Sequence, residues 1–489
     1  MRGSATLDAC PGILTLHPAR DGHVARIRLP GGYVSRAQWA ALAALAADFG
    51  DGCLDLTARG NVQLRGLQPT AAAELARRAA WSGLLPSGAH DRSRNITASP
   101  LSGLGGRRPL RRLVGALDAA LIADPELAAL PGRFLCAVDD GTGGAALADS
   151  DLGLRRSSGR VELFVAGRSA GVRVFVRAAV PAVLTAAAEA IVRGVGSQVT
   201  RIRDLADGGA SVAAAIGGAL GPPASPDDGR LPLGITARDR ATPGVDPDGV
   251  ASNGAASDRP APHPAFASNA TPASDTVPAS NAAPASDTAP ASDTVPASDT
   301  AFAPDATPAS DTAFASGGAV AVIAAPLGRL TGAQIDLIGT LLRSGEVIRL
   351  APAGRVVIPL AVPSAAGPAD QAIGPVNQAA GPADRAFAPD SLARLAAAGL
   401  LTGDDDALAG VTACSGLACN RAVADVRAAA RPLPGHPRTH WAACPRSCGK
   451  PRDAEVVIAA GPDSFLLPGQ SAPRPLADLI APNPPSGTS

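Results

Sequence analysis

The chain is poor in aromatic residues, methionine and lysine. Of its 489 residues only 3% are aromatic, one is methionine, and Lys450 is the only lysine. The apolar fraction of 46% therefore comes mainly from alanine and aliphatic side chains, and nearly all positive charge is carried by arginine. A chain of this length can form two or three domains, each with its own buried core.

An excess of charge of either sign is also missing. The 43 basic and 43 acidic residues give a formal net charge of zero. Extended binding to nucleic acid or to an acidic membrane surface requires a strong basic excess, so we expect neither kind of partner. An anionic ligand must instead be bound by local groups of arginines.

Long hydrophobic runs are absent as well. The N-terminal segment has no continuous apolar stretch, and no uninterrupted run of about 18 apolar residues occurs elsewhere. We therefore expect a soluble, cytoplasmic protein. Of the seven cysteines, four cluster late in the chain, which favours metal ligation over a disulfide framework. Cys10, Cys53 and Cys136 stand alone, and we interpret them as structural.

Two segments have a strongly biased composition. Residues 246–318 repeat "PASDTV"-like hexapeptides of Pro, Ala, Ser, Asp and Thr. They hold too few large apolar side chains to offset the entropy of ordering, so we predict a disordered linker. A shorter stretch that begins at Ser364 has a similar bias and is interpreted as a loop insertion.

The segments on either side of the linker resemble each other. Each copy has a predicted strand, a turn with proline, a helix that opens with a capping box, and then two alternating strands. The boxes are Ser35 to Gln38 in the first copy and Thr331 to Gln334 in the second. We therefore predict a duplicated α+β unit whose copies pack about a pseudo-twofold axis.

The predicted fold class is α+β, with duplicated ferredoxin-like half-domains, further α+β domains and a disordered insertion. Between the copies, "LRRLVGALDAALIADPEL" and "VPAVLTAAAEAIVRGV" are predicted helices, and "RVELFVAG" with "GVRVFVRA" a predicted hairpin. The predicted domains are a first half-domain at 12–85, an α+β domain at 86–222, the linker at 246–318, a second half-domain at 319–363 and a cysteine-bearing α+β domain at 390–480.

The late cysteines form two pairs. Four residues separate Cys414 from Cys419, three separate Cys444 from Cys448, and 24 lie between the pairs. Four thiolates can hold zinc or a [4Fe-4S] cluster, and the long spacings favour the cluster, although zinc and unliganded cysteines remain open. The predicted helix "NRAVADVRAA" begins directly after Cys419 and would place that thiolate at a helix N-terminus.

Arginine and amide side chains alternate in "LTARGNVQLRG". On a strand, alternate residues share one face, and this face would donate hydrogen bonds to carboxylates or lie in solvent as an ordinary polar surface. Further arginines and an asparagine occur in "RIRLPGG" and "HDRSRNITASP". The candidate ligand-binding residues are Arg26, Arg59, Asn61, Gln63, Arg65, Arg94 and Asn95.

Together these motifs resemble the nitrite and sulfite reductase superfamily, in which a duplicated half-domain, a "T-x-R-x-N-x-Q-x-R-G"-like strand, an "R-N" loop and two late cysteine pairs occur. Within it, "HWAACPRSCGKP" and the compact length are most similar to the precorrin-3B synthases. The resemblance implies that the arginines and amides above bind a tetrapyrrole. It implies that Cys414, Cys419, Cys444 and Cys448 ligate a [4Fe-4S] cluster, with Cys448 nearest the macrocycle.

Two positions depart from the reductase pattern. Sulfite reductases have two lysines, two residues apart, that bind the anionic substrate, and the matching positions here are Arg133 and Leu135. The first cysteine spacing is also one residue shorter than is common in the family. The loss of one cation favours a tetrapyrrole substrate over a doubly charged oxyanion, with Arg133 as a further binding residue.

The resemblance thus implies an oxygen-dependent monooxygenase of aerobic cobalamin biosynthesis. It would convert precorrin-3A and O2 to precorrin-3B by C-20 hydroxylation and γ-lactone formation, as a monomer, with electrons from NAD(P)H through a reductase or from ferredoxin. A mononuclear non-haem iron is a further candidate cofactor; His90, His436 and His440 are interpreted as structural. The alternatives are a sirohaem-dependent nitrite or sulfite reductase and a non-enzymatic zinc protein.

Overall fold

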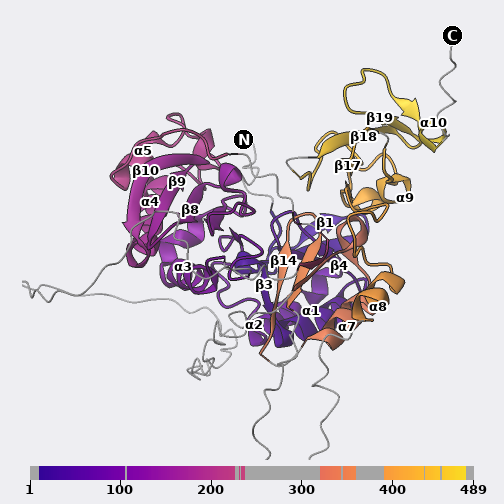
Figure 1. Cartoon of the computed structure of the whole chain (residues 1–489), viewed down its shortest axis with the longest axis horizontal. Helices are drawn as coiled ribbons and strands as arrows, with labels where there is room; N and C mark the ends of the chain where they lie inside the picture. Colours follow the sequence, from indigo (N-terminus) through magenta and orange to yellow (C-terminus); the bar gives the residue numbers. More distant parts are fainter. Residues whose placement is uncertain are drawn as a thin grey trace, which may run out of the picture. The chain divides into compact units, whose positions relative to one another are not determined.

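The computed structural model describes residues 10–104, 107–225, 231, 233–236, 320–342, 345–359, 390–433, 435–451 and 454–480 (Figure 1). In this part of the chain the strands form four five-stranded sheets. The predicted linker at 246–318 lies outside the described residues, as does most of the biased stretch that begins at Ser364. No described helix combines the length and apolarity needed to cross a membrane.

The first half-domain contains an antiparallel sheet with the strand order β1-β2-β5-β4-β13. Its helices α1 and α2 contact each other, and α1 also packs on β4 and β5. The elements are β1 (His17–Ala19), β2 (Gly22–Ile27), η1 (Pro30–Gly32), β3 (Tyr33–Ser35), α1 (Arg36–Phe49), β4 (Leu54–Leu56), β5 (Val62–Leu67), η2 (Pro69–Ala71) and α2 (Ala72–Trp81).

The second half-domain repeats this order of elements. Its sheet has the strand order β11-β12-β15-β14-β3 and is also antiparallel. The duplicated α+β unit that the sequence predicts is therefore confirmed. The elements are β11 (Gly234–Thr236), β12 (Val320–Ala324), η6 (Pro326–Gly328), β13 (Arg329–Leu330), α7 (Gly332–Leu341), β14 (Val347–Ala351), β15 (Arg355–Pro359) and α8 (Ser391–Ala397).

One short strand of each copy pairs with the sheet of the other copy. Strand β3 of the first copy pairs with β14, so that Val34 lies opposite Ile348. Strand β13 of the second copy pairs with β4, so that Leu330 lies opposite Leu54. The exchange is reciprocal because both strands occupy the same place in the repeat, between the proline turn and the helix.

The two long helices of the repeat begin at the predicted capping boxes. Ser35 caps α1 by accepting from the backbone N–H of Gln38, whose side chain accepts from the N–H of Ser35. Thr331 and Gln334 make the same reciprocal pair at α7. A cap of this kind typically contributes about 1 kcal/mol, so both helix starts are fixed by local sequence.

The copies share one hydrophobic core, which includes buried residues of α1 and α7. Trp39, Leu42, Ile335 and Ile338 are each at most 1% exposed, and the indole Nε1 of Trp39 donates to the carbonyl of Ile335 at 3.0 Å. Burying a large apolar side chain contributes about 1.5–3 kcal/mol. The pairing of the two copies is therefore part of the core itself.

Between the copies lies an α+β domain whose sheet has the strand order β10-β9-β8-β7-β6. Strands β6, β7 and β8 are parallel, and β8, β9 and β10 are antiparallel. The predicted hairpin is confirmed as β9 and β10, and the two predicted helices as α3 and α4. The elements are β6 (Ile96–Ala98), α3 (Arg111–Ala123), η3 (Pro125–Ala129), β7 (Cys136–Asp139), η4 (Leu147–Asp149), β8 (Leu152–Arg156), β9 (Arg160–Val165), β10 (Arg168–Phe175), α4 (Val176–Val192), η5 (Ile202–Asp204) and α5 (Ala210–Ala215).

The last region carries the paired cysteines on the sheet β16-β17-β18-β19-β20. Strands β16, β17 and β18 are parallel, and the remaining pairs are antiparallel. The core under this sheet includes Trp441 and Phe465, whose rings lie 5.3 Å apart. The elements are β16 (Val411–Ala413), η8 (Gly416–Ala418), α9 (Val426–Ala429), β17 (Thr439–Ala442), β18 (Glu455–Gly461), β19 (Ser464–Leu466), β20 (Arg474–Pro475) and α10 (Leu476–Ile480).

The helix predicted directly after Cys419 is wrong in its start. Helix α9 begins only at Val426, because the side chain of Asp425 caps it by accepting from the N–H of Ala428 at 3.2 Å. The intervening residues form turns. The thiol of Cys419 therefore does not lie at a helix N-terminus.

Candidate functional site

Both cysteine pairs start at the same edge of the last sheet. Cys414 directly follows β16, and Cys444 lies two residues after β17. Because these strands are parallel, their carboxyl ends meet at one edge, and the backbone N–H of Cys414 donates to the carbonyl of Trp441 at 3.0 Å. The sheet thus brings together two segments that are distant in sequence.

Backbone N–H groups point at two of the thiols. The N–H of Ala443 donates to Sγ of Cys414 at 3.2 Å, and the N–H of Arg421 donates to Sγ of Cys419 at 3.5 Å. Such bonds favour the ionised sulfur and tune the potential of a redox centre bound through it. The loop backbone is therefore suited to thiolate ligands.

The other three paired thiols act electrostatically on Cys448. The pKa of Cys448 is raised, first by burial and then by Cys444, Cys414 and Cys419, against the lowering effect of Arg446. Among the described residues, however, no three His, Cys, Asp or Glu side chains gather closely enough to hold one metal ion. The long sequence spacings of the two pairs remain the reason to expect a [4Fe-4S] cluster rather than zinc.

The three histidines singled out from the sequence have structural partners. His90 is buried and lies 2.8 Å from Ser87 Oγ and 3.0 Å from the carbonyl of Asp124. His436 contacts Glu455. His440 is 1% exposed with its Nδ1 3.0 Å from Thr412 Oγ1, and burial lowers its pKa to about 4.

The alternating stripe on and before β5 does not form one open donor surface. Asn61 accepts from the N–H of Leu29 and donates to Asn95 Oδ1, at 2.9 and 3.0 Å. Gln63 Oε1 accepts from Nη2 of Arg26 at 2.8 Å. These amides therefore hold neighbouring elements in place.

Arg65 and Arg94 each have a carboxylate partner. Arg65 is 4% exposed and pairs with Asp21 through Nε and Nη2, at 2.8 and 3.0 Å. Arg94 is 5% exposed and pairs with Asp118 of α3 through Nε and Nη2, at 2.8 and 2.7 Å. Their charges are thus balanced within the protein. Asn95 donates to the carbonyl of Phe134 at 3.1 Å.

Arg59 lies among other cations. Its pKa is lowered to about 10, first by burial and then by the charges of Arg201 and Arg26. Its Nη1 donates to the carbonyl of Arg133 at 3.4 Å, while the side chain of Arg133 is exposed. Guanidiniums that repel one another favour the binding of an anion. This group, Arg26, Arg59 and Arg201, is called the arginine group below.

Arg201 was missed by the sequence reasoning. Its Nε pairs with Asp151 Oδ2 at 2.7 Å, and the fully buried Asp151 also accepts from the N–H of Leu135 at 2.9 Å. Arg59 and Arg201 are therefore both linked to the segment from Arg133 to Leu135. No strand pattern or repeat marks "TRIRDL", so only the folded structure identifies this residue.

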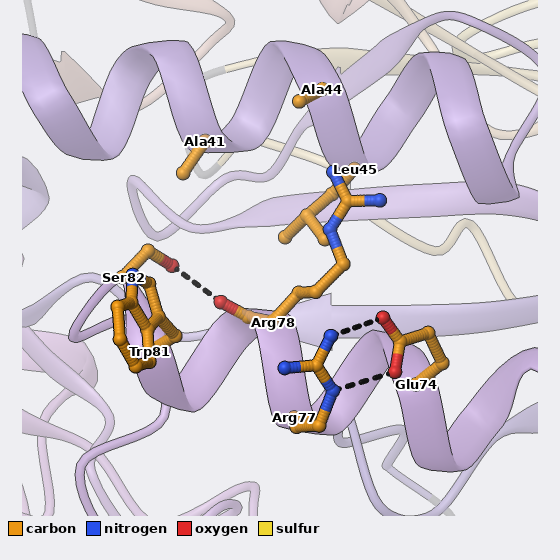
Figure 2. A pocket seen from close by; sticks show the side chains of 8 residues that line it. All are labelled: Ala41, Ala44, Leu45, Glu74, Arg77, Arg78, Trp81 and Ser82. Atoms are coloured by element: carbon orange, nitrogen blue, oxygen red, sulfur yellow. Dashed lines mark hydrogen bonds and ion pairs between the residues drawn. The ribbon is translucent and has the colours of Figure 1, made fainter.

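A separate shallow pocket lies between α1 and α2 (Figure 2). Arg77 pairs there with Glu74 through two bonds, and Trp81 is 79% exposed. None of the predicted site residues lines it. The lining residues are Ala41, Ala44, Leu45, Glu74, Arg77, Arg78, Trp81 and Ser82.

Comparisons with known proteins agree with the duplicated fold. Residues 17–80 match the family described as nitrite/sulfite reductase ferredoxin-like half domain. The chain is 37% identical over 127 residues to a ferredoxin–nitrite reductase of Synechococcus elongatus, covering 24% of this chain and 25% of that protein. It is 32% identical over 122 residues to a ferredoxin–nitrite reductase of Leptolyngbya laminosa, covering 23% and 24%. The matched segments thus span about a quarter of these relatives.

A solved structure extends the likeness in fold to nearly the whole chain. The NirA protein of Mycobacterium tuberculosis superposes with a TM-score of 0.57, covering 96% of this chain and 79% of that chain, at 17% identity. The expected precorrin-3B synthase activity is contradicted, because the matching relatives are named nitrite reductases. Residues 17–80 are therefore similar to the ferredoxin-like half domain of nitrite and sulfite reductases, and the fold of the chain is similar to that of the NirA protein.

Proposed function

We propose that this protein is an oxidoreductase of the nitrite and sulfite reductase type that reduces a small oxyanion. The observation that carries the proposal is that both cysteine pairs begin at one sheet edge, with backbone N–H groups directed at the thiols of Cys414 and Cys419. Cys414, Cys419, Cys444 and Cys448 would hold a [4Fe-4S] cluster. When bound, this cluster and sirohaem supply electron transfer and coordination of the oxyanion.

Arg59, in the arginine group, would bind the anionic ligand, while Arg201 is paired with Asp151. Arg59 has its pKa lowered by burial and by neighbouring cations, so a carboxylate that approaches it relieves repulsion among like charges. A tetrapyrrole such as sirohaem carries many carboxylates and fits this donor set. The residues that hold balanced charges, Arg65 and Arg94, would position the surrounding elements rather than contact the ligand.

Nitrite fits the segment from Arg133 to Leu135 better than sulfite does. Leu135 is 2% exposed and offers no charge, which leaves the Arg133 side chain as the segment's cation. A singly charged oxyanion needs less compensation than a doubly charged one. We expect kcat/KM to be higher for nitrite than for sulfite, and the reverse order would contradict this assignment.

The names of the curated relatives support ferredoxin as the electron donor. The whole function is tested by anaerobic purification followed by iron, acid-labile sulfide and zinc analysis, a visible spectrum, and nitrite-dependent oxidation of reduced methyl viologen. We expect iron and sulfide in equal amounts, sirohaem absorption and turnover. Zinc without sulfide, or a cluster without sirohaem or turnover, would overturn the proposal.

A matched pair of cysteine variants sharpens this test. Cys414→Ser should abolish cluster binding, because it replaces a thiol that receives a backbone N–H bond. Cys53→Ser changes a cysteine outside the two pairs and should keep the iron and sulfide content of the wild type. Equal iron content in both variants would show that the four thiols do not form the site.

A further inference from the structure

The geometry points to a network of Asp55, Arg65 and Arg427 that holds the first cysteine loop, Cys414–Cys419, against the first half-domain and so positions the cluster ligands. The inference rests on the proposed function in naming a cluster as the bound group. It goes beyond that function because it assigns a positioning role to residues that lie outside the ligand set.

Arg65 reaches the cysteine loop from strand β5. Its Nη1 donates to Ser415 Oγ at 3.3 Å, and its Nη2 donates to the carbonyl of Ala418 at 3.0 Å. Both acceptors lie between the two cysteines. The guanidinium is itself held by Asp21, which leaves it little freedom to rotate. The same carbonyl of Ala418 also accepts from the N–H of Arg20 at 3.1 Å.

Arg427 contacts Cys414, the first residue of the loop. It lies on α9, and its Nε donates to the carbonyl of Cys414 at 3.1 Å. Its Nη2 lies 3.6 Å from Oδ1 of Asp55 on strand β4. The ligand residue Cys414 is thus linked through one side chain to a carboxylate of the first half-domain.

Asp55 is the centre of the network. It is 7% exposed and lies near three guanidiniums, at 3.2 Å from Arg329, 3.6 Å from Arg427 and 3.9 Å from Arg65. These come from β13, α9 and β5, so one carboxylate joins three segments that are distant in sequence. Such a buried centre needs all its partners, because a charge left unpaired is costly.

The loop itself has little regular structure to fix it. Only η8 lies within it. The loop is held instead by hydrogen bonds from outside: Arg427 donates to the carbonyl of Cys414, Arg65 to Ser415 Oγ, and both Arg65 and Arg20 to the carbonyl of Ala418. The thiols of this loop receive backbone N–H donors from Arg421 and Ala443. Because these N–H to sulfur distances tune a cluster's potential, a loosened loop changes that potential and the retention of iron.

The test uses the anaerobically purified full chain with Arg427→Gln and Arg65→Lys. Arg77→Gln is the control, since the exposed side chain of Arg77 on α2 pairs only with Glu74 of the same helix in the described part of the chain. We measure the midpoint potential by an EPR-monitored titration and the rate of iron loss to a chelator. We expect a shifted potential in both variants and iron loss about ten-fold faster or more, as for other outer partners of metal ligands. A potential and a rate equal to those of the control would overturn the inference.

A second readout keeps the inference testable if the wild type holds no cluster, an outcome that defeats the proposed function alone. In metal-free protein, alkylation of Cys414 and Cys419 is followed by mass spectrometry. Loosening of the loop should raise their reaction rates several-fold in Arg427→Gln and leave Cys53 unchanged. Circular dichroism is used to check that the milder Arg65→Lys variant is folded. Unchanged rates at both loop cysteines would refute the positioning role.

Discussion

The two copies of the repeat share the same helix caps and turn glycines and differ in their polar side chains. Aligned on the capping boxes and on Gly60 and Gly354, whose φ angles are 69° and 70°, the first copy has Arg59, Asn61, Gln63 and Arg65. The second copy has Ala353, Arg355, Val357 and Pro359 at the matching positions. Turns and caps thus occur in both copies, whereas the run of four donor side chains occurs only in the first.

The exchanged strands show the same divergence. Asp55 faces Arg329 across β4 and β13, and the pair forms a salt bridge of 3.2 Å. At the matching pair in the other sheet, Arg349 faces Tyr33 and its guanidinium lies 5.1 Å from the ring centroid. At this repeat position the first copy therefore has an acid that lies near Arg427, where the second copy has a base.

The largest effect is expected at Asp55. Asp55→Asn leaves three guanidiniums without their shared carboxylate, and removal of one partner of a buried ion pair costs about 3–5 kcal/mol. Tyr33→Phe, at the matching strand pair in the other sheet, removes only a hydroxyl near Ser102 and should cost about 1 kcal/mol. Urea unfolding measures both free energies, and equal losses would remove the asymmetry between the copies.

A smaller effect is expected for ligand binding. Arg59→Gln removes a guanidinium of the arginine group and should weaken the binding of a carboxylate-rich tetrapyrrole by about 1.5–3 kcal/mol. Arg355→Gln changes a buried arginine of the second copy and serves as the control. Titration of sirohaem, followed by absorbance, should show weaker binding for the first variant only. An equal loss for Arg355→Gln would place ligand binding in both copies.

Alanine at the repeat glycines should destabilise both copies alike. Both glycines have left-handed φ angles, which cost a residue with a Cβ about 1–2 kcal/mol. A Cβ on Gly60 would also lie 2.6 Å from the carbonyl oxygen of Leu350, and one on Gly354 would lie 2.8 Å from Cα of Gly328. Thermal unfolding of Gly60→Ala and Gly354→Ala measures this, and a neutral result at either site would break the equivalence.

The smallest effect is expected at the caps. Ser35→Ala and Thr331→Ala each remove one side-chain acceptor and should cost about 1 kcal/mol. Guanidinium unfolding of the two variants should give closely similar losses, since both boxes have the same reciprocal geometry. A loss confined to one copy would mean that tertiary packing, rather than the cap, fixes the other helix.

Local signals in the sequence predicted the elements well. The caps at Ser35 and Thr331 and the β9–β10 hairpin, with Ala166 and Gly167 at positive φ in its turn, each depend on neighbouring residues. The strand exchange could not be predicted, because β3 and β13 have three and two residues and no apolar period. Their pairing is decided by partners far away in the chain.

For the candidate site, the sequence predicts which residue types could bind a ligand, but not which partners they have in the folded chain. The cysteine pairs and Arg59 stay predictions, whereas the partners of Arg65 and Arg94 lie 44 and 24 residues away in sequence, so the pairing of these two charges cannot be predicted from neighbouring residues. Alternation suggested one common face, whereas each of its side chains has its own partner. Arg201 is likewise held by a partner that is distant in sequence, Asp151, 50 residues away.

Because β3 and β13 each complete the sheet of the other copy, neither half-domain is complete by itself. If one copy is produced without the other, its sheet loses a terminal strand and exposes unpaired backbone groups along that edge. The short strand that it contributes to the other sheet then has no strand to pair with. Two such fragments can satisfy each other by swapping these strands across a twofold axis. The intact chain can therefore be regarded as a strand-swapped homodimer fused into one polypeptide, in which one half was then free to specialise in chemistry.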